Sequence, residues 1–302
     1  MITTVSVGDR VRNSFKFNVL KLPMLALAAD GTLLESDDFG LYRDDDWSQV
    51  HTRTVKSTYI PHTLDQLVGL CEVAVSVFDE CEVACHFHHG HYIRLTPSKE
   101  YRMSVYGTMD NVFPSLMIRA PYNLRSLEGV LGLYRDTCQN MAMLSSVQTA
   151  SMRIPHLSTL DNKVDELTDL FADLKASWAD IKLFVTQMQN IKVLLAGFLV
   201  DVFGPEPVLS DDVTQRKVNN YRQRERLITN RIIDERRRTG RPQYDGIVSL
   251  WEAYNGVQGY HQHDASNVRK LSSFERILKA NDNPYVKAAE QTARATVQGI
   301  YG

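Results

Sequence analysis

The side chains with the clearest chemical potential lie between Thr214 and Arg241, where ten cations face only three carboxylates. Nine of the ten are arginine, whose planar guanidinium forks onto phosphate oxygens and stacks on bases, which lysine does poorly. The chain has 34 basic and 36 acidic residues, so this segment carries +7 and the remainder carries −9. We interpret the segment as a local phosphate-binding patch. Its cations are Arg216, Lys217, Arg222, Arg224, Arg226, Arg231, Arg236, Arg237, Arg238 and Arg241.

Apolar residues in the same segment predict a helix over about residues 213–239, ended by Gly240. They form a narrow stripe, so that one side docks while the arginines face outward. A second interpretation stays open, in which the helix pairs with acidic loops of the same protein or of a neighbouring subunit. The strongly acidic remainder of the chain favours that alternative. The stripe consists of Val218, Tyr221, Ile228 and Ile232.

A second group of reactive side chains runs from Cys81 to His91 and has the ligand types of a tetrahedral zinc site. The segment also predicts a hairpin that turns at His89-Gly90. Alternation along its first strand would separate His86 and His88 from Cys85. No second ligand pair with zinc-finger spacing follows, so we expect a hairpin with surface histidines, no bound metal and no cofactor.

Familiar catalytic motifs are missing: the sequence has no GxxxxGK[ST], no GxGxxG after a strand, no HExxH and no GxSxG. Three consecutive carboxylates, Asp44 to Asp46, point in different directions and are typical of a solvated loop. His261 and His263 beside Asp264 are typical of a polar helix end. We therefore expect no enzymatic activity and assign no catalytic residues.

The elements that would position these groups are strand-rich in residues 1–152. The apolar stretch 15–29 ends at an Asp-Gly turn, and an acidic loop containing Asp37, Asp38 and Asp44 to Asp46 follows. We predict a helix over 64–78 and a hairpin over 86–95. Further strands are predicted over 52–60, 102–108 and 116–120, with Pro114 between the last two.

From about residue 153 to residue 302 the pattern is helical. Apolar residues from Leu160 to Met188 alternate steps of four and three, which predicts a long helix over about 158–203 with a break near 187–190. We favour packing of this seam on its own domain, with a coiled-coil contact as the alternative. Two more helices are predicted over 246–261 and 284–300. The fold class is therefore α+β, a strand-rich N-terminal half packed with a mainly helical C-terminal half.

Composition and the N-terminal sequence argue against a disordered, a secreted or a membrane-spanning protein. Apolar residues make up 43% and charged residues 23% of the 302 residues, which are ordinary proportions for a folded domain. Only four cysteines occur, Cys71, Cys81, Cys85 and Cys138, which favours a reducing compartment. The N-terminus lacks the pattern of a signal peptide, and the apolar run 193–200 is too short to span a membrane. We expect a protein of the host cytoplasm that does not enter membranes.

Four stretches, in order, resemble a large phage-and-plasmid family catalogued as domain of unknown function nine hundred and thirty-two. The first combines Tyr42-Arg43 with the segment 52–61, and the second is Cys138-Gln-Asn140. The third is the segment 154–159, and the fourth is Ala253-Tyr-Asn-Gly-Val-Gln-Gly-Tyr260-His-Gln-His263. The family has no agreed activity. Its phage setting implies a role in viral DNA metabolism.

Together, the basic helix and the resemblance lead us to expect sequence-independent binding of single-stranded DNA, by analogy with phage single-stranded-DNA-binding proteins. Arginines would hold phosphates, Tyr221 would offer a stacking face, and Arg102 and Arg119 would extend the groove. The protein would act in viral replication, recombination by strand annealing, or transcription, as a homo-oligomer with viral RNA polymerase or replication proteins as partners. The alternative is a protein-interaction or assembly factor that binds no nucleic acid.

Overall fold

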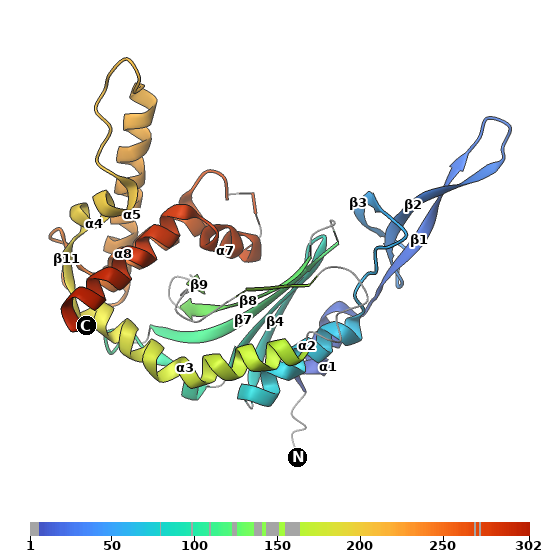
Figure 1. Ribbon diagram of the computed structural model, residues 1–302, viewed down its shortest axis with the longest axis horizontal. Coiled ribbons are helices and arrows are strands. Elements are labelled where there is room, and N and C mark those ends of the chain that lie inside the picture. The colour runs from blue at the N-terminus through green and yellow to red at the C-terminus, as the bar shows by residue number, and fades with distance from the viewer. Residues whose placement is uncertain are drawn as a thin grey trace. The chain divides into compact units, whose positions relative to one another are not determined.

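The computed structural model describes residues 6–78, 80–97, 99–108, 110–122, 126–135, 141–142, 151–154, 164–268, 270–271 and 273–302. Strands occur mainly in the N-terminal half and helices mainly in the C-terminal half (Figure 1), which confirms the α+β class. The chain forms two compact units. Unit 1 comprises Met1–Tyr101, Pro114–Gly132 and Ser145–Ala176, and unit 2 comprises Arg102–Phe113, Leu133–Leu144 and Ser177–Gly302. The predicted domain boundary at residues 152/153 stays a prediction.

Unit 1 opens with helix α1 (Val7–Phe15) and an antiparallel sheet of β1 (Val19–Leu27), β2 (Leu33–Arg43) and β3 (Gln49–Val55). The predicted turn lies between β1 and β2, where Gly31 adopts a φ of 86° that favours glycine. The prediction of one acidic loop was wrong in part. Asp37 and Asp38 lie within β2, at an irregularity of the pairing, because the flanking residues Glu35 and Phe39 pair with β1, and only Asp44 to Asp46 lie in the following turn.

The second sheet has the strand order β10-β8-β7-β5-β4, with β6 paired to β7 and β9 paired to β8. Its strands are β4 (Cys81–Phe87), β5 (Gly90–Pro97), β6 (Met103–Ser104), β7 (Asn111–Pro121), β8 (Leu127–Arg135), β9 (Met141–Ala142) and β10 (Ser151–Ile154). Helix α2 (Leu64–Phe78) has the predicted bounds. The histidine-rich hairpin is confirmed, with His89 at its turn in a left-handed conformation.

Three strand predictions need correction. The strand predicted over 52–60 is β3, which begins earlier, at Gln49, and ends at Val55. Pro114 lies within β7, between the part of β7 that pairs with β6 and the part that pairs with β5. The segment 102–108 contributes only the two residues of β6, preceded by a short 3-10 turn, η1 (Lys99–Tyr101). After β6 the chain turns through Tyr106 and Gly107, both at positive φ, and a run of extended residues cannot include these conformations.

The long helical region is interrupted where the seam slips. Helix α3 (Val164–Asn190) gives way to the short strand β11 (Lys192–Leu194) and then to α4 (Leu195–Phe203), which confirms the predicted break. The predicted start near residue 158 lies outside the described residues. From Trp178 onward the seam is buried, with Ile181, Val185 and Met188 at most 4% exposed. These side chains pack within the chain's own core, as we favoured, and leave no coiled-coil face there.

The remaining helices of unit 2 are α5 (Gln215–Arg238), α6 (Leu250–Gly259), the π-helix η3 (Tyr260–Asp264), α7 (Ser273–Asn281) and α8 (Pro284–Tyr301). Strand β12 (Ile247–Ser249) pairs with β11 and leads into α6. Ser249 and Glu252 form a capping box that fixes the start of α6. Every residue of α6 is buried, so it is the central helix of the unit. Among the described residues, no helix combines the length and apolar character that crossing a membrane requires.

Candidate nucleic-acid interface

The cations of α5 fall into two groups that the sequence does not distinguish. One group, toward the end of the helix, is neutralised by carboxylates of unit 2. The other, between residues 216 and 226, faces solvent or an open pocket. Arg237 and Arg238 are also exposed, and Arg237 lies 3.5 Å from Asp234.

Arg236 is the most buried cation of the helix, with 9% of its surface exposed. Its guanidinium donates to both carboxylate oxygens of Glu252 and, at 2.8 Å, to the carbonyl of Ile247. Burial alone would raise the pKa of Glu252, but the hydrogen bond from Arg236 and the capping bond from Ser249 outweigh it and leave that pKa below its usual value. Arg236 therefore holds β12 and α6 together, and its predicted role in phosphate binding has no support in these contacts.

An ordered chain of alternating charges extends from this pair. Arg241 lies 3.1 Å from Glu252 and 2.9 Å from Glu235, and its guanidinium covers the ring of Tyr106 at 4.0 Å. Glu235 in turn accepts two hydrogen bonds from Arg135, at 2.6 and 2.8 Å. Arg135 also donates to Asp110, and both side chains are nearly inaccessible. This network of ion pairs matches three arginines with three carboxylates. Arg241 is therefore a structural cation rather than a ligand for phosphate.

Three further predicted cations are also engaged. Arg231 donates through two nitrogens to Oδ2 of Asp264, at 2.9 and 2.8 Å. Arg119 lies in unit 1, 8% exposed, 3.4 Å from Glu128 and over the ring of Tyr92. Arg102 is half-buried with its guanidinium 5.2 Å from the ring centre of Phe113. Each is held by its own neighbours, so the predicted extension of a groove by Arg102 and Arg119 has no support in these contacts.

The exposed group begins with Arg216 and Lys217 at the start of α5. Lys217 has one weak contact, 3.5 Å from Nζ to the carbonyl of Asp212. Arg222 lies 2.5 Å from Glu206, and both side chains of this pair are largely in water, where such a bond contributes little. Arg226 is exposed and has no carboxylate partner among the described residues. These four cations remain available to an anionic ligand.

Arg224 is presented in a different way, by aromatic rings. Its guanidinium lies 3.9 Å from the ring centre of Phe203 and 5.3 Å from those of Tyr221 and Tyr285. Cation–π contacts of this kind fix the direction of a flexible side chain. His261 stacks on Tyr285, and burial, with a smaller contribution from Arg224, lowers its pKa to about 4. His261 is therefore neutral near pH 7 and adds no positive charge beside Arg224.

Tyr221 does not offer the stacking face that the sequence suggested. Only 8% of the residue is exposed, and its hydroxyl donates to the carbonyl of Gly204 at 3.0 Å. The ring instead supports Arg224 and joins α5 to the segment that precedes it. An aromatic surface for a base must come from another residue.

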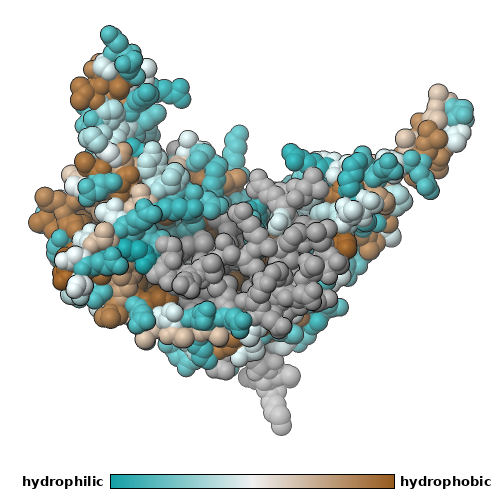
Figure 2. All heavy atoms as spheres, in the orientation of Figure 1, coloured by the Kyte–Doolittle hydropathy of each residue, from teal (hydrophilic) through white to brown (hydrophobic). Residues whose placement is uncertain are grey.

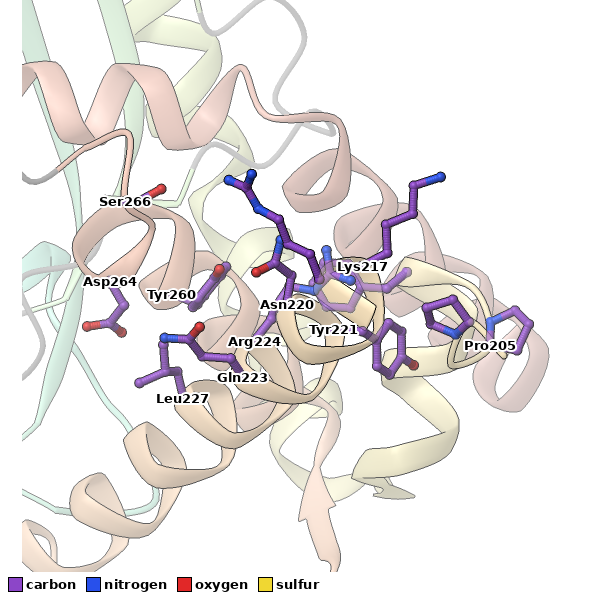
Figure 3. A pocket seen from close by; sticks show the side chains of 13 residues that line it. Pro205, Lys217, Asn220, Tyr221, Gln223, Arg224, Leu227, Tyr260, Asp264 and Ser266 are labelled. Carbon is purple, nitrogen blue, oxygen red and sulfur yellow. The ribbon is translucent and has the colours of Figure 1, made fainter. Parts of the chain in front are cut away.

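A pocket of about 540 Å³ opens beside the exposed cations (Figure 3). One wall is the face of α5 from Arg216 to Leu227, the second is the segment 203–207 after α4, and the third is η3 with the turn that follows it. A π-helix such as η3 is rare in proteins overall, and those that occur often lie at functional sites. The pocket is lined by Phe203, Pro205, Pro207, Arg216, Lys217, Asn220, Tyr221, Gln223, Arg224, Leu227, Tyr260, Asp264 and Ser266.

The histidine and cysteine residues that the structure describes do not gather into a metal site. Within the part of the chain that the structure describes, no group of three or more histidine, cysteine or acidic residues could hold an ion, and Cys138 lies outside that part. The expectation of surface histidines was wrong for His91. It is 1% exposed against Phe15 and Phe17, accepts or donates one hydrogen bond at 3.1 Å with the hydroxyl of Tyr122, and burial lowers its pKa to about 3.

The fold and the pocket together define an α+β protein that presents a cluster of solvent-facing cations on one helix. The family model described as Domain of unknown function (DUF932) matches residues 124–296, more than half of the chain, and the chain belongs to that family. The matched region includes α5, α6 and all the residues that line the pocket. No curated protein and no solved structure gives a significant match. Tyr260, in the last of the motifs that suggested this family, lines the pocket.

Sequence reasoning missed the carboxylates that neutralise Arg231, Arg236 and Arg241. Glu235 lies beside Arg236 in the sequence, yet it pairs with Arg135, a hundred residues away. One signal was present, since Ser249 and Glu252 have the spacing of a capping box and so placed a carboxylate at the start of a helix. Nothing in the sequence connects Asp264 with Arg231 or brings Tyr260 to α5.

Proposed function

We propose that the protein binds single-stranded DNA without sequence preference, through the exposed cations in the first half of α5. The observation that carries this proposal is the local excess of free positive charge. Five cations lie between Arg216 and Arg226, and in the described structure the ion pair of Arg222 with Glu206 is the one carboxylate bond among them. Phosphates are the ligands that such a cluster attracts, irrespective of base sequence.

The length of the cation cluster limits the number of phosphates that it can contact. Residues 216 and 226 are ten positions apart, which corresponds to about 15 Å of helix and therefore to a few phosphates. A site this short binds weakly alone, so tight binding or annealing of complementary strands requires several copies that place their clusters along one strand. The proposed homo-oligomer would meet this requirement. Roles in phage replication, recombination or transcription within the host cytoplasm are part of the same proposal.

A gel shift across a range of salt concentrations tests this function, with single-stranded DNA, duplex DNA and RNA as probes. We expect the single strand to bind at low salt and to dissociate as salt rises. The triple replacement of Arg216, Lys217 and Arg226 by alanine should weaken binding and flatten the salt dependence. A matched control replaces the exposed cations Arg10, Arg53 and Lys192, which removes equal charge away from α5. No binding by the natural protein at low salt, or equal losses in both triple variants, would refute the proposal.

A second candidate function, assembly with further copies of the chain, is favoured by the β1–β2 hairpin. Leu25, Leu27, Leu33 and Leu34 are between 51% and 72% exposed near its turn. Figure 2 shows hydrophobic atoms gathered over this end of the hairpin. Exposed apolar clusters of this kind mark contact surfaces on water-soluble domains. Light scattering on the natural protein, and on a variant in which Leu27 and Leu33 are replaced by glutamate, tests whether the hairpin joins copies.

A further inference from the structure

The pocket beside α5 has more features than phosphate binding requires. Its α5 wall presents Asn220 and Gln223, whose amides both donate and accept hydrogen bonds. Its opposite wall presents the half-buried ring of Tyr260 together with Ser266. In Figure 3 the side chains of Asn220, Gln223 and Tyr260 lie near one another with Asp264 on one side, and Lys217 extends outward on the other. Amides, a hydroxyl and an aromatic ring are the groups that recognise a nucleobase.

The charges of the lining are unevenly distributed. Arg216 and Lys217 come from the first turn of α5, whereas Asp264 comes from the end of η3. Arg231 contacts only Oδ2 of Asp264, and no described group is bonded to Oδ1. A free carboxylate oxygen accepts an N–H, which the exocyclic amino groups and ring nitrogens of bases supply. The pocket thus has a cationic side suited to a phosphate and a side suited to a base edge.

We propose that this pocket takes one unpaired nucleotide, with its phosphate at Arg216 and Lys217 and its base against Tyr260. This inference rests on the proposed function and assigns the preference for single strands to the pocket. The volume of about 540 Å³ lies within the usual range of small-ligand pockets. In a duplex the base is stacked and its edge is already paired, so entry requires unstacking and unpairing, and duplex DNA is left with the phosphate contacts alone.

The polar groups of the pocket can accept any base instead of selecting one. These groups are Asn220, Gln223 and the free oxygen of Asp264. Both amides present a donor and an acceptor, and Oδ1 accepts from any base that carries an amino group or a ring N–H. Stacking on an aromatic ring accepts every base, because each base has a π-face. The same pocket therefore agrees with binding that ignores sequence. It discriminates between paired and unpaired bases instead of between base types.

The experiment measures affinity for single-stranded and duplex DNA of one sequence, with Tyr260→Ala and Gln223→Ala as variants. Gln223 is exposed on α5, so its replacement leaves the fold intact even if loss of Tyr260 does not. We expect Tyr260→Ala to weaken single-strand binding about tenfold. Duplex binding should stay unchanged, so that the ratio of the two affinities falls. Tyr301→Ala, at an exposed ring near the end of α8, is the matched control and should leave the ratio as it is.

A direct readout uses an oligodeoxythymidine with a single 2-aminopurine, whose fluorescence changes when the base leaves its stack and enters a protein site. A change on binding that Gln223→Ala and Tyr260→Ala reduce supports the pocket. If both variants keep the ratio of affinities and the fluorescence response, the pocket assignment fails while DNA binding by α5 stands. Absence of binding to either form of DNA at low salt overturns the DNA-binding function itself, and the pocket assignment with it.

Discussion

Arg236 and Glu252 form a two-pronged ion pair inside unit 2, with Nε 2.7 Å from Oε1 and Nη2 3.1 Å from Oε2. The pair joins the last turn of α5 to the capping box of α6. One of the most arginine-rich stretches of the chain, Arg236 to Arg238, thus contains a cation that belongs to the core and two that belong to the surface. This difference between neighbours in sequence gives the first prediction.

Arg236→Ala should destabilise the protein by about 3 kcal/mol, because it removes the two-pronged partner of the buried Glu252 carboxylate and leaves that carboxylate with Arg241 as its one remaining cation among the described residues. Arg238→Ala removes the same charge from an exposed position and should change the free energy of unfolding by less than about 0.5 kcal/mol. Urea denaturation followed by circular dichroism measures both. Similar stabilities of the two variants would contradict the structural role of Arg236.

Charge content was readable from the sequence, but charge pairing was not. Helices α2 and α5 were predicted to within two residues, since their apolar spacing and end signals are local. The same reasoning assigned Asp37 and Asp38 to a loop, although pairing with the strand β1 determines their conformation. The expectation that the arginines all face outward failed for the same reason. Arg231 and Arg236 are neutralised by carboxylates 33 and 16 residues away, and only the packing of η3 and α6 against α5 brings them together.

Glu206→Gln should strengthen DNA binding. The exposed carboxylate of Glu206 bonds to Arg222, and removing its charge frees this cation and lowers the negative charge near the cluster. Because exposed ion pairs contribute about 0.2–1 kcal/mol, the gain should be roughly 1.4-fold to fivefold. Fluorescence anisotropy with a labelled single strand at low salt measures it. An exposed acid in unit 1, such as Asp65→Asn, is a control for net charge alone, and an equal gain there would remove the role of Glu206.

The number of phosphates held by α5 can be counted from the salt dependence. If Arg216, Lys217 and Arg226 each contact one phosphate, replacing all three with alanine should lower the slope of log affinity against log salt by about 2. The slope separates loss of phosphate contacts from a general loss of affinity, which would shift the line without tilting it. An unchanged slope with weaker binding would place the phosphates elsewhere.

Stability should fall as the solution becomes acidic, beginning near the ordinary pKa of histidine. Burial lowers the pKa of His91 to about 3 and that of His261 to about 4, so both are neutral in the folded protein at pH values where the unfolded chain binds protons. Their contribution is complete above about pH 6.5 and is lost as pH falls, by up to about 1.4 kcal/mol per pH unit for each group. Urea midpoints at several pH values measure the slope. His91→Phe should reduce it, whereas His88→Phe, on the exposed side of the hairpin turn, should not.

The exposed leucines of the β1–β2 hairpin give a prediction about assembly that is independent of α5. Leu27 is 72% exposed and pairs in register with Leu33, which is 61% exposed, so glutamate at both positions introduces two charges without removing core contacts. If these leucines join copies of the chain, the double variant should have a lower mass by light scattering at every concentration, with unchanged thermal stability of the monomer. Loss of the oligomer should also weaken binding to long single strands more than to short ones, because only long strands engage several clusters. Equal masses for the natural protein and the variant would rule out the hairpin as the contact between copies and leave the DNA-binding proposal unaffected.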